Sequence, residues 1–443
     1  MRRLDAGAGP DVTIDFEGKA ISARVGEPAA CALLAAGESV FSRSIKYHRP
    51  RGPFCMAASC SQCLMRIDGL PNRFSCQAPV HEGMRLERQN AFPTAGVDVF
   101  ASIDWMFPRG LDHHSMFAGV PVADKVMAVV ARQLAGLGLL PDAVEPAARP
   151  PERLDAQVTV VGGGAAGLAA ARALSAAGIP VLLLEAEDRL GGRLVLEAPE
   201  EHGEIRAVSA PSDAKVRLRT GVLGLYDDEL GRVLVAVEHG PEGSRLVLVK
   251  SRALLFTLGG HASVLPFENN DIPGVFSGRA ASDLLLRRRL LVGDAPALVG
   301  RGSQLIALQR MFELAGAQPV LVLDVQAPEG TAGVVSGQPL RAHGRTWVHG
   351  LSFRSADGRV QRTDCDAVVV SLPASPAFEL PRQAGVKVAF QSALETFAPV
   401  ADDDGRTPVH DVWIAGDALR PGSAREAIDS GRRAGEALAR TLR

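Results

Sequence analysis

The chain of 443 residues is poor in aromatic side chains and in cysteine, and it has no large excess of charge of either sign. Two Tyr and three Trp are too few for a surface on which nucleic-acid bases would stack. The formal net charge of −2 gives no general attraction to nucleic acid or to anionic lipid. The composition therefore argues against a nucleic-acid-binding protein.

Long apolar runs are also missing. No segment has the roughly 18 uncharged apolar residues that a membrane-spanning helix needs. The most apolar helical candidate, residues 125–140, is interrupted by Arg132 and Gln133. The opening residues, MRRLDAGAGPDVTIDF, lack the apolar core of a secretory signal. We therefore expect a cytoplasmic protein, and in a reducing compartment clustered cysteines more often bind metal or do redox chemistry than form disulfides.

Four of the six cysteines are clustered, with the spacing Cys55-x4-Cys60-x2-Cys63-x12-Cys76. A C-x4-C-x2-C core followed by a distant cysteine is the spacing of plant-type [2Fe–2S] sites. A zinc site is the alternative, but zinc sites more often use two C-x2-C pairs, and only one is present. The sequence predicts that these four thiolates ligate a [2Fe–2S] cluster.

The residues before the cysteines favour iron over zinc. Residues 12–25 alternate like a hairpin that turns at Glu17-Gly18, and residues 28–37 have the pattern of a helix. A hairpin, a helix and a cysteine loop follow one another in this order in β-grasp ferredoxins. Cys31, on that helix, and Cys365, near the strand VVVSL, are interpreted as buried core thiols.

Residues 157–192, QVTVVGGGAAGLAAARALSAAGIPVLLLEAEDRLGG, have the order strand, glycine-rich turn, helix, strand. The turn has the G-x-G-x-x-G spacing, and Glu185 stands where an acid would bind an adenosine ribose. The pyrophosphate is expected at the helix N-terminus, where free N–H groups and the helix dipole favour anions. The alternative is a Rossmann unit that binds nothing. The candidate cofactor residues are Gly162, Gly164, Ala165, Ala166, Gly167, Glu185, Gly192 and Arg193.

The C-terminal segment 409–438 decides between FAD and NAD for this unit. A strand leads to Gly416 and Asp417, and a helix rich in Gly and Ala follows. In flavoproteins with two dinucleotide-binding domains this arrangement forms the second half of the FAD site. Asp417 is expected to bind the ribityl or phosphate region, and the helix N-terminus to stabilise the reduced flavin. The alternative is an ordinary strand, turn and helix.

A second glycine motif lies in residues 296–324, but it is imperfect: Gly300-x-Gly302-x-x-Leu305. Leu305 stands in the place of the third glycine, and its side chain is expected to push the helix off the strand. Asp324 still ends the second strand. Gly300, Gly302 and Asp324 are thus candidate nucleotide-binding residues, and NAD, another nucleotide or an empty site are all left open.

Together these segments predict an α/β two-dinucleotide-binding-domain flavoprotein, Rossmann-like, with an N-terminal β-grasp [2Fe–2S] ferredoxin-like domain. The expected divisions are a ferredoxin-like domain over 1–98, a helical connector over 99–155, a first FAD-binding part over 156–290, a second nucleotide-binding-like domain over 291–375 and a second FAD-binding part over 376–443.

Residues 43–77, RSIKYHRPRGPFCMAASCSQCLMRIDGLPNRFSCQ, carry a family resemblance. They resemble the iron–sulfur subunits or domains of opine dehydrogenases, hydroxyproline and proline dehydrogenases and hydrogen cyanide synthase, and the N-terminal domain of heterotetrameric sarcosine oxidase α. The stretch DWMFPRGLDHHSMF fits the same group. The part from VTVVGGGAAGLAAA through PFENNDIPGVFSG to WIAGD is similar to their FAD-carrying α subunits.

The resemblance implies the α subunit of a heteromeric amino-acid or amine dehydrogenase, an oxidoreductase that transfers electrons. In that family a separate β subunit, similar to D-amino-acid oxidase, binds its own FAD and oxidises the amine. Opines, hydroxyproline, proline or sarcosine-like amines are the implied substrates. An FMN at a subunit interface, peripheral contact with the respiratory chain and a further small subunit are also consistent with it.

Several points stay open at the level of sequence. The catalytic residues, the substrate and the final electron acceptor are unassigned. His113-His114 is interpreted as part of a hydrogen-bonded loop between domains, with an interface or a cofactor edge as the alternatives. The alternative hypotheses for the function are an NAD(P)H-dependent FAD/[2Fe–2S] reductase, a subunit of hydrogen cyanide synthase that oxidises glycine, and a scaffold with vestigial sites.

Overall fold

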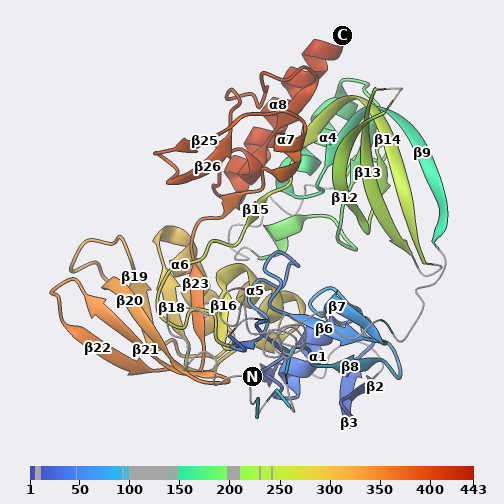
Figure 1. Cartoon of the computed structure of the whole chain (residues 1–443). Helices are drawn as coiled ribbons and strands as arrows, with labels where there is room; N and C mark the ends of the chain where they lie inside the picture. Colours follow the sequence, from blue (N-terminus) through green and yellow to red (C-terminus); the bar gives the residue numbers. More distant parts are fainter. Residues whose placement is uncertain are drawn as a thin grey trace, which may run out of the picture. The chain divides into compact units, whose positions relative to one another are not determined.

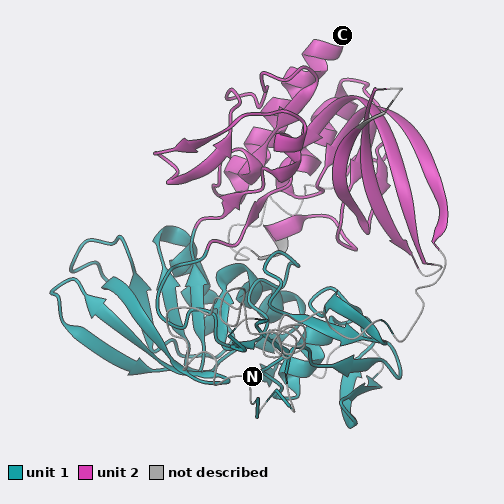
Figure 2. Ribbon diagram, viewed as in Figure 1, with its two compact units in different colours: residues 1–145, 264–372 teal, residues 146–263, 373–443 magenta. Residues whose placement is uncertain are grey.

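The computed structural model describes residues 1–4, 11–45, 47–91, 94–95, 97–98, 141, 148–196, 210–228, 231–240 and 243–443. The chain divides into two compact units, each built from two separate parts of the sequence (Figure 2). Unit 1 comprises residues 1–145 and 264–372, and unit 2 comprises residues 146–263 and 373–443. Of the expected helical connector, residues 99–140 lie outside the described residues, whereas residues 149–155 belong to strand β9 rather than to a linker.

The first part of unit 1 contains a five-stranded sheet in the order β3-β2-β8-β6-β7, with helix α1 beside it (Figure 1). Strands β2 and β3 are antiparallel and are joined at Glu17 and Gly18, whose φ angles of 52° and 83° make a tight turn. The predicted hairpin and helix are confirmed. The elements are β1 (Arg2–Arg3), β2 (Asp11–Phe16), β3 (Lys19–Arg24), α1 (Ala29–Ala35), β4 (Ser42–Arg43), β5 (Pro50–Arg51), β6 (Leu64–Ile67), β7 (Leu70–Phe74) and β8 (Arg85–Glu87).

The second part of unit 1 is a seven-stranded sheet in the order β16-β23-β18-β19-β20-β21-β22. Strands β16, β23, β18, β19 and β20 pair in parallel, and β20, β21 and β22 form an antiparallel meander. The elements are β16 (Val275–Ser277), α5 (Gly278–Ser282), η5 (Asp283–Arg287), β17 (Leu290–Leu291), β18 (Ala297–Gly300), α6 (Gly302–Leu314), β19 (Leu321–Asp324), β20 (Val335–Gly344), β21 (Val348–Ser355), β22 (Val360–Asp364) and β23 (Val368–Ser371).

The two parts of unit 1 share one hydrophobic core. Phe16 and Leu33 of the ferredoxin-like part belong to the same buried cluster as Phe276, Leu284 and Leu305 of the central part. The structure also moves the expected boundary at residue 290. Residues 264–290 belong with the central sheet rather than with the flavin-binding part, because β16 pairs in parallel with β23.

Unit 2 contains a seven-stranded sheet in the order β11-β10-β9-β14-β13-β12, with β27 also paired to β14. Strands β11, β10, β9, β14 and β27 are parallel, and β12 and β13 continue β14 as an antiparallel meander. The elements are β9 (Arg149–Val161), α4 (Ala165–Ala176), β10 (Val181–Leu184), η2 (Gly192–Leu196), β11 (Lys215–Arg217), β12 (Thr220–Asp228), β13 (Gly231–Gly240), β14 (Gly243–Phe256), β15 (Gly260–His261), β24 (Ser375–Pro376), α7 (Glu379–Gln383), β25 (Val388–Gln391), β26 (Thr396–Pro399), β27 (Val412–Ile414), η6 (Gly416–Ala418) and α8 (Ala424–Leu442).

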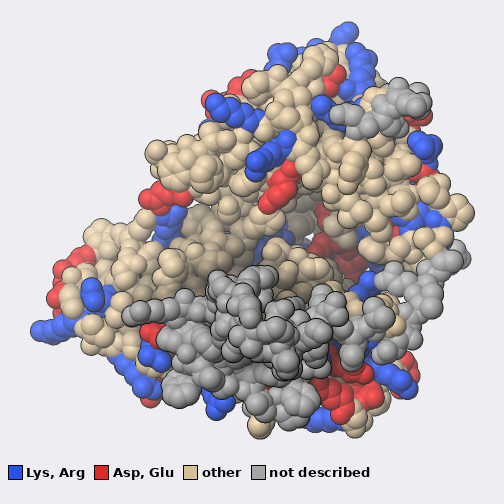
Figure 3. All heavy atoms as spheres, in the orientation of Figure 1, with Lys and Arg blue, Asp and Glu red and all other residues tan. Residues whose placement is uncertain are grey.

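The large sheet of each unit therefore follows the same plan, a parallel layer extended by an antiparallel meander. This plan confirms the expected fold class. Because the carboxyl ends of parallel strands meet at one edge, it also places the loops after β9, β14 and β27 together. Acidic and basic side chains are interspersed over the visible described surface (Figure 3). Among the described residues, no helix combines the length and the apolarity needed to cross a membrane.

Candidate cofactor sites

The four clustered cysteines come from two neighbouring places in the ferredoxin-like sheet. Cys55, Cys60 and Cys63 lie in the loop between β5 and β6, and Cys76 follows β7. Ser75 donates its N–H and its hydroxyl to the Cys63 carbonyl, at 3.2 Å and 2.7 Å. Because β6 and β7 are antiparallel neighbours, this contact brings the distant fourth cysteine to the loop.

The structure arranges the four thiols as two pairs. A hydrogen bond from the Cys60 thiol lowers the pKa of Cys55 to about 5, and one from the Cys76 thiol lowers the pKa of Cys63. Two pairs of sulfurs match a centre with two irons, each of which takes two thiolates. Across the described part of the chain, no three His, Cys, Asp or Glu side chains converge on a point that would hold a single ion.

The backbone of this loop points its N–H groups at sulfur. Ala57 N donates to Cys55 Sγ at 3.4 Å, Ser59 N also donates to Cys55, and Ala58 N donates to Cys76. Small side chains at these positions allow the close approach. N–H donors to sulfur favour the thiolate and tune the potential of a cluster.

In unit 2 the first glycine motif forms the turn between β9 and α4, and its three glycines have different surroundings. A Cβ on Gly162, whose φ is 105°, would stand 2.4 Å from the Thr257 carbonyl oxygen, and one on Gly167 would stand 1.9 Å from the Gly162 carbonyl oxygen. A Cβ on Gly164 would meet nothing within 4 Å. Gly162 and Gly167 are therefore needed for packing, whereas Gly164 keeps open space at the N-terminus of α4.

Glu185 follows β10 and is buried. Its carboxylate accepts hydrogen bonds from Gly163 N at 2.6 Å and from Glu187 N at 2.8 Å. The acid expected at the ribose therefore also fixes the glycine-rich turn. Each oxygen keeps lone-pair capacity for a hydroxyl.

The C-terminal motif meets the same turn. Arg193 Nη1 lies 2.9 Å from Asp417 Oδ2, and its Nη2 donates to the Gly422 carbonyl. A Cβ on Gly416 would be 2.7 Å from the Cβ of Ala166, and one on Gly192 would be 3.1 Å from the Cα of Gly164. The structure thus brings together the candidate residues of unit 2, and we call this group the α4 site: Gly162, Gly164, Ala165, Ala166, Gly167, Glu185, Gly192, Arg193, Gly416 and Asp417.

Thr257 supports the α4 site, and the sequence did not reveal this role. It is buried at the end of β14, and its hydroxyl is 3.0 Å from the Val161 carbonyl oxygen and 2.8 Å from that of Gly162. Thr257 therefore holds the first glycine of the turn. One signal was available in the sequence. Thr257 follows a buried strand and precedes Gly259 and Gly260, and the residues of the α4 site likewise lie after the ends of strands.

Gly300, Gly302 and Asp324 form a separate site in unit 1. Gly302 N donates to Asp324 Oδ2 at 3.0 Å, which resembles the bond between Gly163 and Glu185 in unit 2. Helix α6 begins at Gly302 itself, whereas α4 begins only after Gly164. Leu305 is fully buried in the core of unit 1, so its side chain has become part of the packing.

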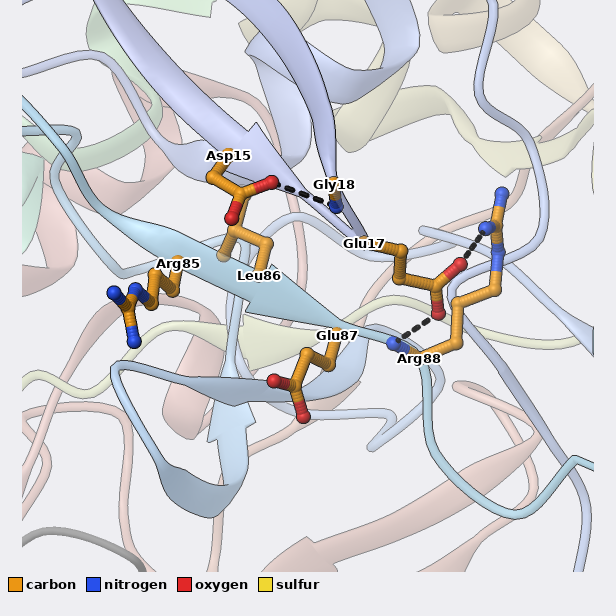
Figure 4. A pocket seen from close by; sticks show the side chains of 7 residues that line it. All are labelled: Asp15, Glu17, Gly18, Arg85, Leu86, Glu87 and Arg88. Carbon is orange, nitrogen blue, oxygen red and sulfur yellow. Dashed lines mark hydrogen bonds and ion pairs between the residues drawn. The ribbon is translucent and has the colours of Figure 1, made fainter.

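Two features remain. His113-His114 lies outside the described residues. A surface pocket of about 360 Å³ opens on the ferredoxin-like part (Figure 4). Of its two arginines, Arg88 is already paired with Glu17 and Glu38, at 2.5 Å and 2.7 Å. The pocket is lined by Asp15, Glu17, Gly18, Arg85, Leu86, Glu87 and Arg88.

Comparison with protein families gives two matches. Residues 9–91 match the 2Fe-2S iron-sulfur cluster binding domain, and residues 160–207 match the NAD(P)-binding Rossmann-like domain. The N-terminal part is therefore a [2Fe–2S] domain, as expected, and the glycine motif of unit 2 lies in a dinucleotide-binding unit. The first match includes all four paired cysteines.

Curated relatives fit the same pattern. The alpha subunit of sarcosine oxidase from Rhizobium meliloti (strain 1021) is 28% identical over 72% of this chain. The A subunit of opine oxidase from Agrobacterium tumefaciens (strain Ach5) is 25% identical over 62% of this chain and 63% of its own length. The HcnA subunit of hydrogen cyanide synthase from Pseudomonas aeruginosa is 36% identical over 18% of this chain and 76% of its own length. The chain spans about a third, 35%, of the length of the sarcosine oxidase subunit.

Solved structures show the same fold. L-proline dehydrogenase from P. horikoshii superposes with a TM-score of 0.71 at 21% identity, over 99% of this chain and 75% of that one. Thioredoxin reductase from T. acidophilum superposes with a TM-score of 0.51 at 20% identity, over 65% of this chain and 98% of that one. The chain is similar to the α-type subunits of heteromeric amino-acid oxidases, among them those of sarcosine oxidase and opine oxidase.

Proposed function

We propose that this chain is the electron-transfer subunit of a heteromeric dehydrogenase that oxidises an amino acid or a secondary amine. The observation that carries the proposal is that one chain holds both a paired set of four cysteines and a dinucleotide-binding turn completed by Asp417. A flavin supplies two-electron chemistry and a [2Fe–2S] cluster supplies one-electron chemistry, so the two together divide a two-electron oxidation into single steps.

The residues present fit both cofactors. Cys55 and Cys60 would hold one iron, and Cys63 and Cys76 the other, because the structure already pairs them in this way. The neighbouring N–H groups would donate to the sulfurs. The proposal assigns these four side chains as the metal ligands.

In the α4 site, the space beside Gly164 would take a pyrophosphate at the N-terminus of α4. Glu185 would accept from the adenosine ribose, and Asp417 would bind the ribityl region. The combination of an adenosine-binding acid with a second, C-terminal half favours FAD over FMN or NAD here. An FMN, if the complex holds one, would lie against a partner subunit.

Substrate oxidation is assigned to a separate subunit similar to D-amino-acid oxidase. Gripping an amino-acid carboxylate beside a flavin usually takes an Arg or Lys together with a Tyr or another donor. This chain has only two Tyr. Tyr47 precedes the cysteines, and Tyr226 is 60% exposed on the meander strand β12. Two relatives are themselves named as subunits, which supports the expectation of a partner chain.

The test is dye reduction by the purified chain, alone and reconstituted with such a partner. The panel is sarcosine, proline, hydroxyproline, opines and glycine, and turnover on glycine would distinguish the hydrogen cyanide synthase type. We expect turnover by the complex and none by the chain alone. Substantial turnover by the isolated chain would refute the proposal and return the substrate site to this sequence.

A further inference from the structure

Two segments that lie far apart in the sequence and that both contribute to the family resemblance, HRPRG (48–52) and ENNDIPG (268–274), bind each other inside unit 1. Arg49 donates to both carboxylate oxygens of Asp271, from Nε at 3.1 Å and from Nη2 at 2.7 Å. It also donates to Asn269 Oδ1 at 2.9 Å, and Arg51 Nη1 reaches Asp271 Oδ2 at 2.9 Å. One carboxylate thus holds two guanidinium groups, and we call these three ionic side chains the Asp271 clamp.

The Asp271 clamp leads directly into the cysteine loop. Gly52 follows Arg51 and packs against Pro273, whose Cβ would be 3.2 Å from a Cβ on the glycine. The Phe54 carbonyl accepts a hydrogen bond of 3.0 Å from the N–H of Ser277. Cys55 is the next residue. The segment that leads to Cys55, the first predicted cluster ligand, is therefore fixed to the central part of unit 1 at successive residues.

Asp271 is presented by a backbone that is itself fastened to strand β20. The bond from Glu268 N to the Leu340 carbonyl and the bond from Ala342 N to the Glu268 carbonyl are both 2.9 Å long. Asn269, in the left-handed region with φ 62°, donates its side-chain amide to the Ala342 carbonyl at 3.1 Å. These bonds fix the segment that carries the Asp271 carboxylate, and none of them involves the arginines.

The arginines are held as firmly on their own side. They lie on the hairpin β4–β5, and the buried Asp98 contacts two other residues of this hairpin. Asp98 Oδ2 is 3.4 Å from Arg43 Nε and 2.8 Å from His48 Nδ1. A rigid hairpin and a rigid carboxylate lose little freedom when they meet, so the pairing is tighter than that of two mobile surface chains.

We propose that Asp271 is a positioning residue for the [2Fe–2S] centre: through Arg49 and Arg51 it fixes the entry to Cys55 and balances the positive charge beside it. The inference rests on the proposed assignment of the cysteines. Arg51 precedes Cys55 by four residues, a span of at most about 14 Å. At that range a half-buried charge is incompletely screened. Reduction adds negative charge to the cluster. The net charge of the Asp271 clamp therefore affects the reduction potential of the cluster.

The experiment compares reduction potentials of the cluster in the full-length holoprotein, followed by electron paramagnetic resonance during a redox titration. Asp271→Asn keeps the shape but removes one negative charge beside Arg49 and Arg51, so its potential should be more positive than that of the unaltered protein. Arg51→Gln should shift the potential the other way. Asp294→Asn is the matched control, because Asp294 also pairs with an arginine of unit 1, Arg2 at 2.8 Å, but at an exposed site.

Opposite shifts in the two clamp variants, with none in Asp294→Asn, support the proposal. Selective loss of iron from Asp271→Asn with its flavin retained supports it too, because the loop has then lost its support. Unchanged potentials and full iron in both clamp variants would overturn it. Hydrogen exchange of residues 50–57 gives a reading that does not need the cluster: faster exchange is expected in Asp271→Asn and not in the control. Iron-free unaltered protein would instead count against the cysteine assignment.

Discussion

Gly431 of helix α8 touches the backbone of Ala166 in helix α4 so closely that a Cβ on Gly431 would stand 2.0 Å from the Ala166 carbonyl oxygen. One turn later, a Cβ on Gly435 would stand 2.7 Å from the Ala170 carbonyl oxygen. Ala166 lies in the first turn of α4, beside Gly164. The contact between the helices therefore fixes the place where we expect the pyrophosphate.

Replacing Gly431 with Ala should weaken flavin binding while leaving the cluster intact. The added methyl forces the two helices apart, and such overpacking costs about 1–3 kcal/mol. The iron content should stay unchanged because the cysteines belong to unit 1. Flavin released on denaturation and iron per chain are the two readouts. Arg432→Ala, on the exposed face of the same helix, is the control, and full flavin retention in Gly431→Ala would contradict the assignment.

Gly164→Val tests the cofactor site more cleanly, because the added side chain meets no protein atom at its Cβ. We expect the variant to fold as the flavin-free protein does and to bind FAD at least about tenfold more weakly, a loss of about 1.4 kcal/mol. Gly167→Val is the comparison. Its Cβ would strike the Gly162 carbonyl, so it should also lower the thermal stability of the flavin-free protein. If Gly164→Val retains full FAD, the pyrophosphate lies elsewhere.

Cys60→Ala should lose the cluster. Anaerobically purified protein is expected to carry about two irons and two acid-labile sulfides per chain, as a [2Fe–2S] centre requires. Removal of Cys60 leaves one iron with a single thiolate from its pair. Cys365→Ala is the control, since Cys365 is buried in the central part and burial raises its pKa to about 12. Stoichiometric zinc without iron in the unaltered protein would falsify the cluster assignment.

Much of the fold followed from local patterns in the sequence. The turn at Glu17-Gly18, the strand and helix around Gly164, and the strand before Asp417 are each specified by residues close together in the chain. The boundary at residue 290 was wrong because β16 joins the central sheet only by pairing with a strand near residue 369. The expected linker before residue 156 was wrong as well. Those residues extend β9, and residues 149–155 pair in parallel with residues 245–250 of β14.

The sequence pointed to candidate residues where a single motif contains them. It missed residues whose role depends on a contact between two distant segments. The cysteine spacing pointed to four ligands, and the structure added how they pair. Thr257 and Asp271 had no such spacing, because each acts on a segment far away in the sequence, at Gly162 and at Arg49. Leu305 was expected to disturb the central motif. The structure shows it buried, with helix α6 starting at Gly302.

The central site makes a prediction about NADH. Because Leu305 replaces the glycine that would allow close packing at this turn, NADH is not expected to serve as the electron donor. Anaerobic mixing with NADH should therefore leave the flavin absorbance unchanged on the timescale in which substrate reduces the complete complex. Fast bleaching of the flavin would favour the alternative function, an NAD(P)H-dependent reductase.

The central claim is that electrons enter this chain from a partner and pass through its own cofactors. The most direct measurement is the electron paramagnetic resonance signal of the reduced [2Fe–2S] cluster after anaerobic addition of the substrate amine. The account predicts the signal in the reconstituted complex and none in the isolated chain, with Cys60→Ala abolishing it in the complex. A signal of full intensity in the isolated chain, or amine-to-dye turnover in a complex whose cluster never becomes reduced, would contradict the account.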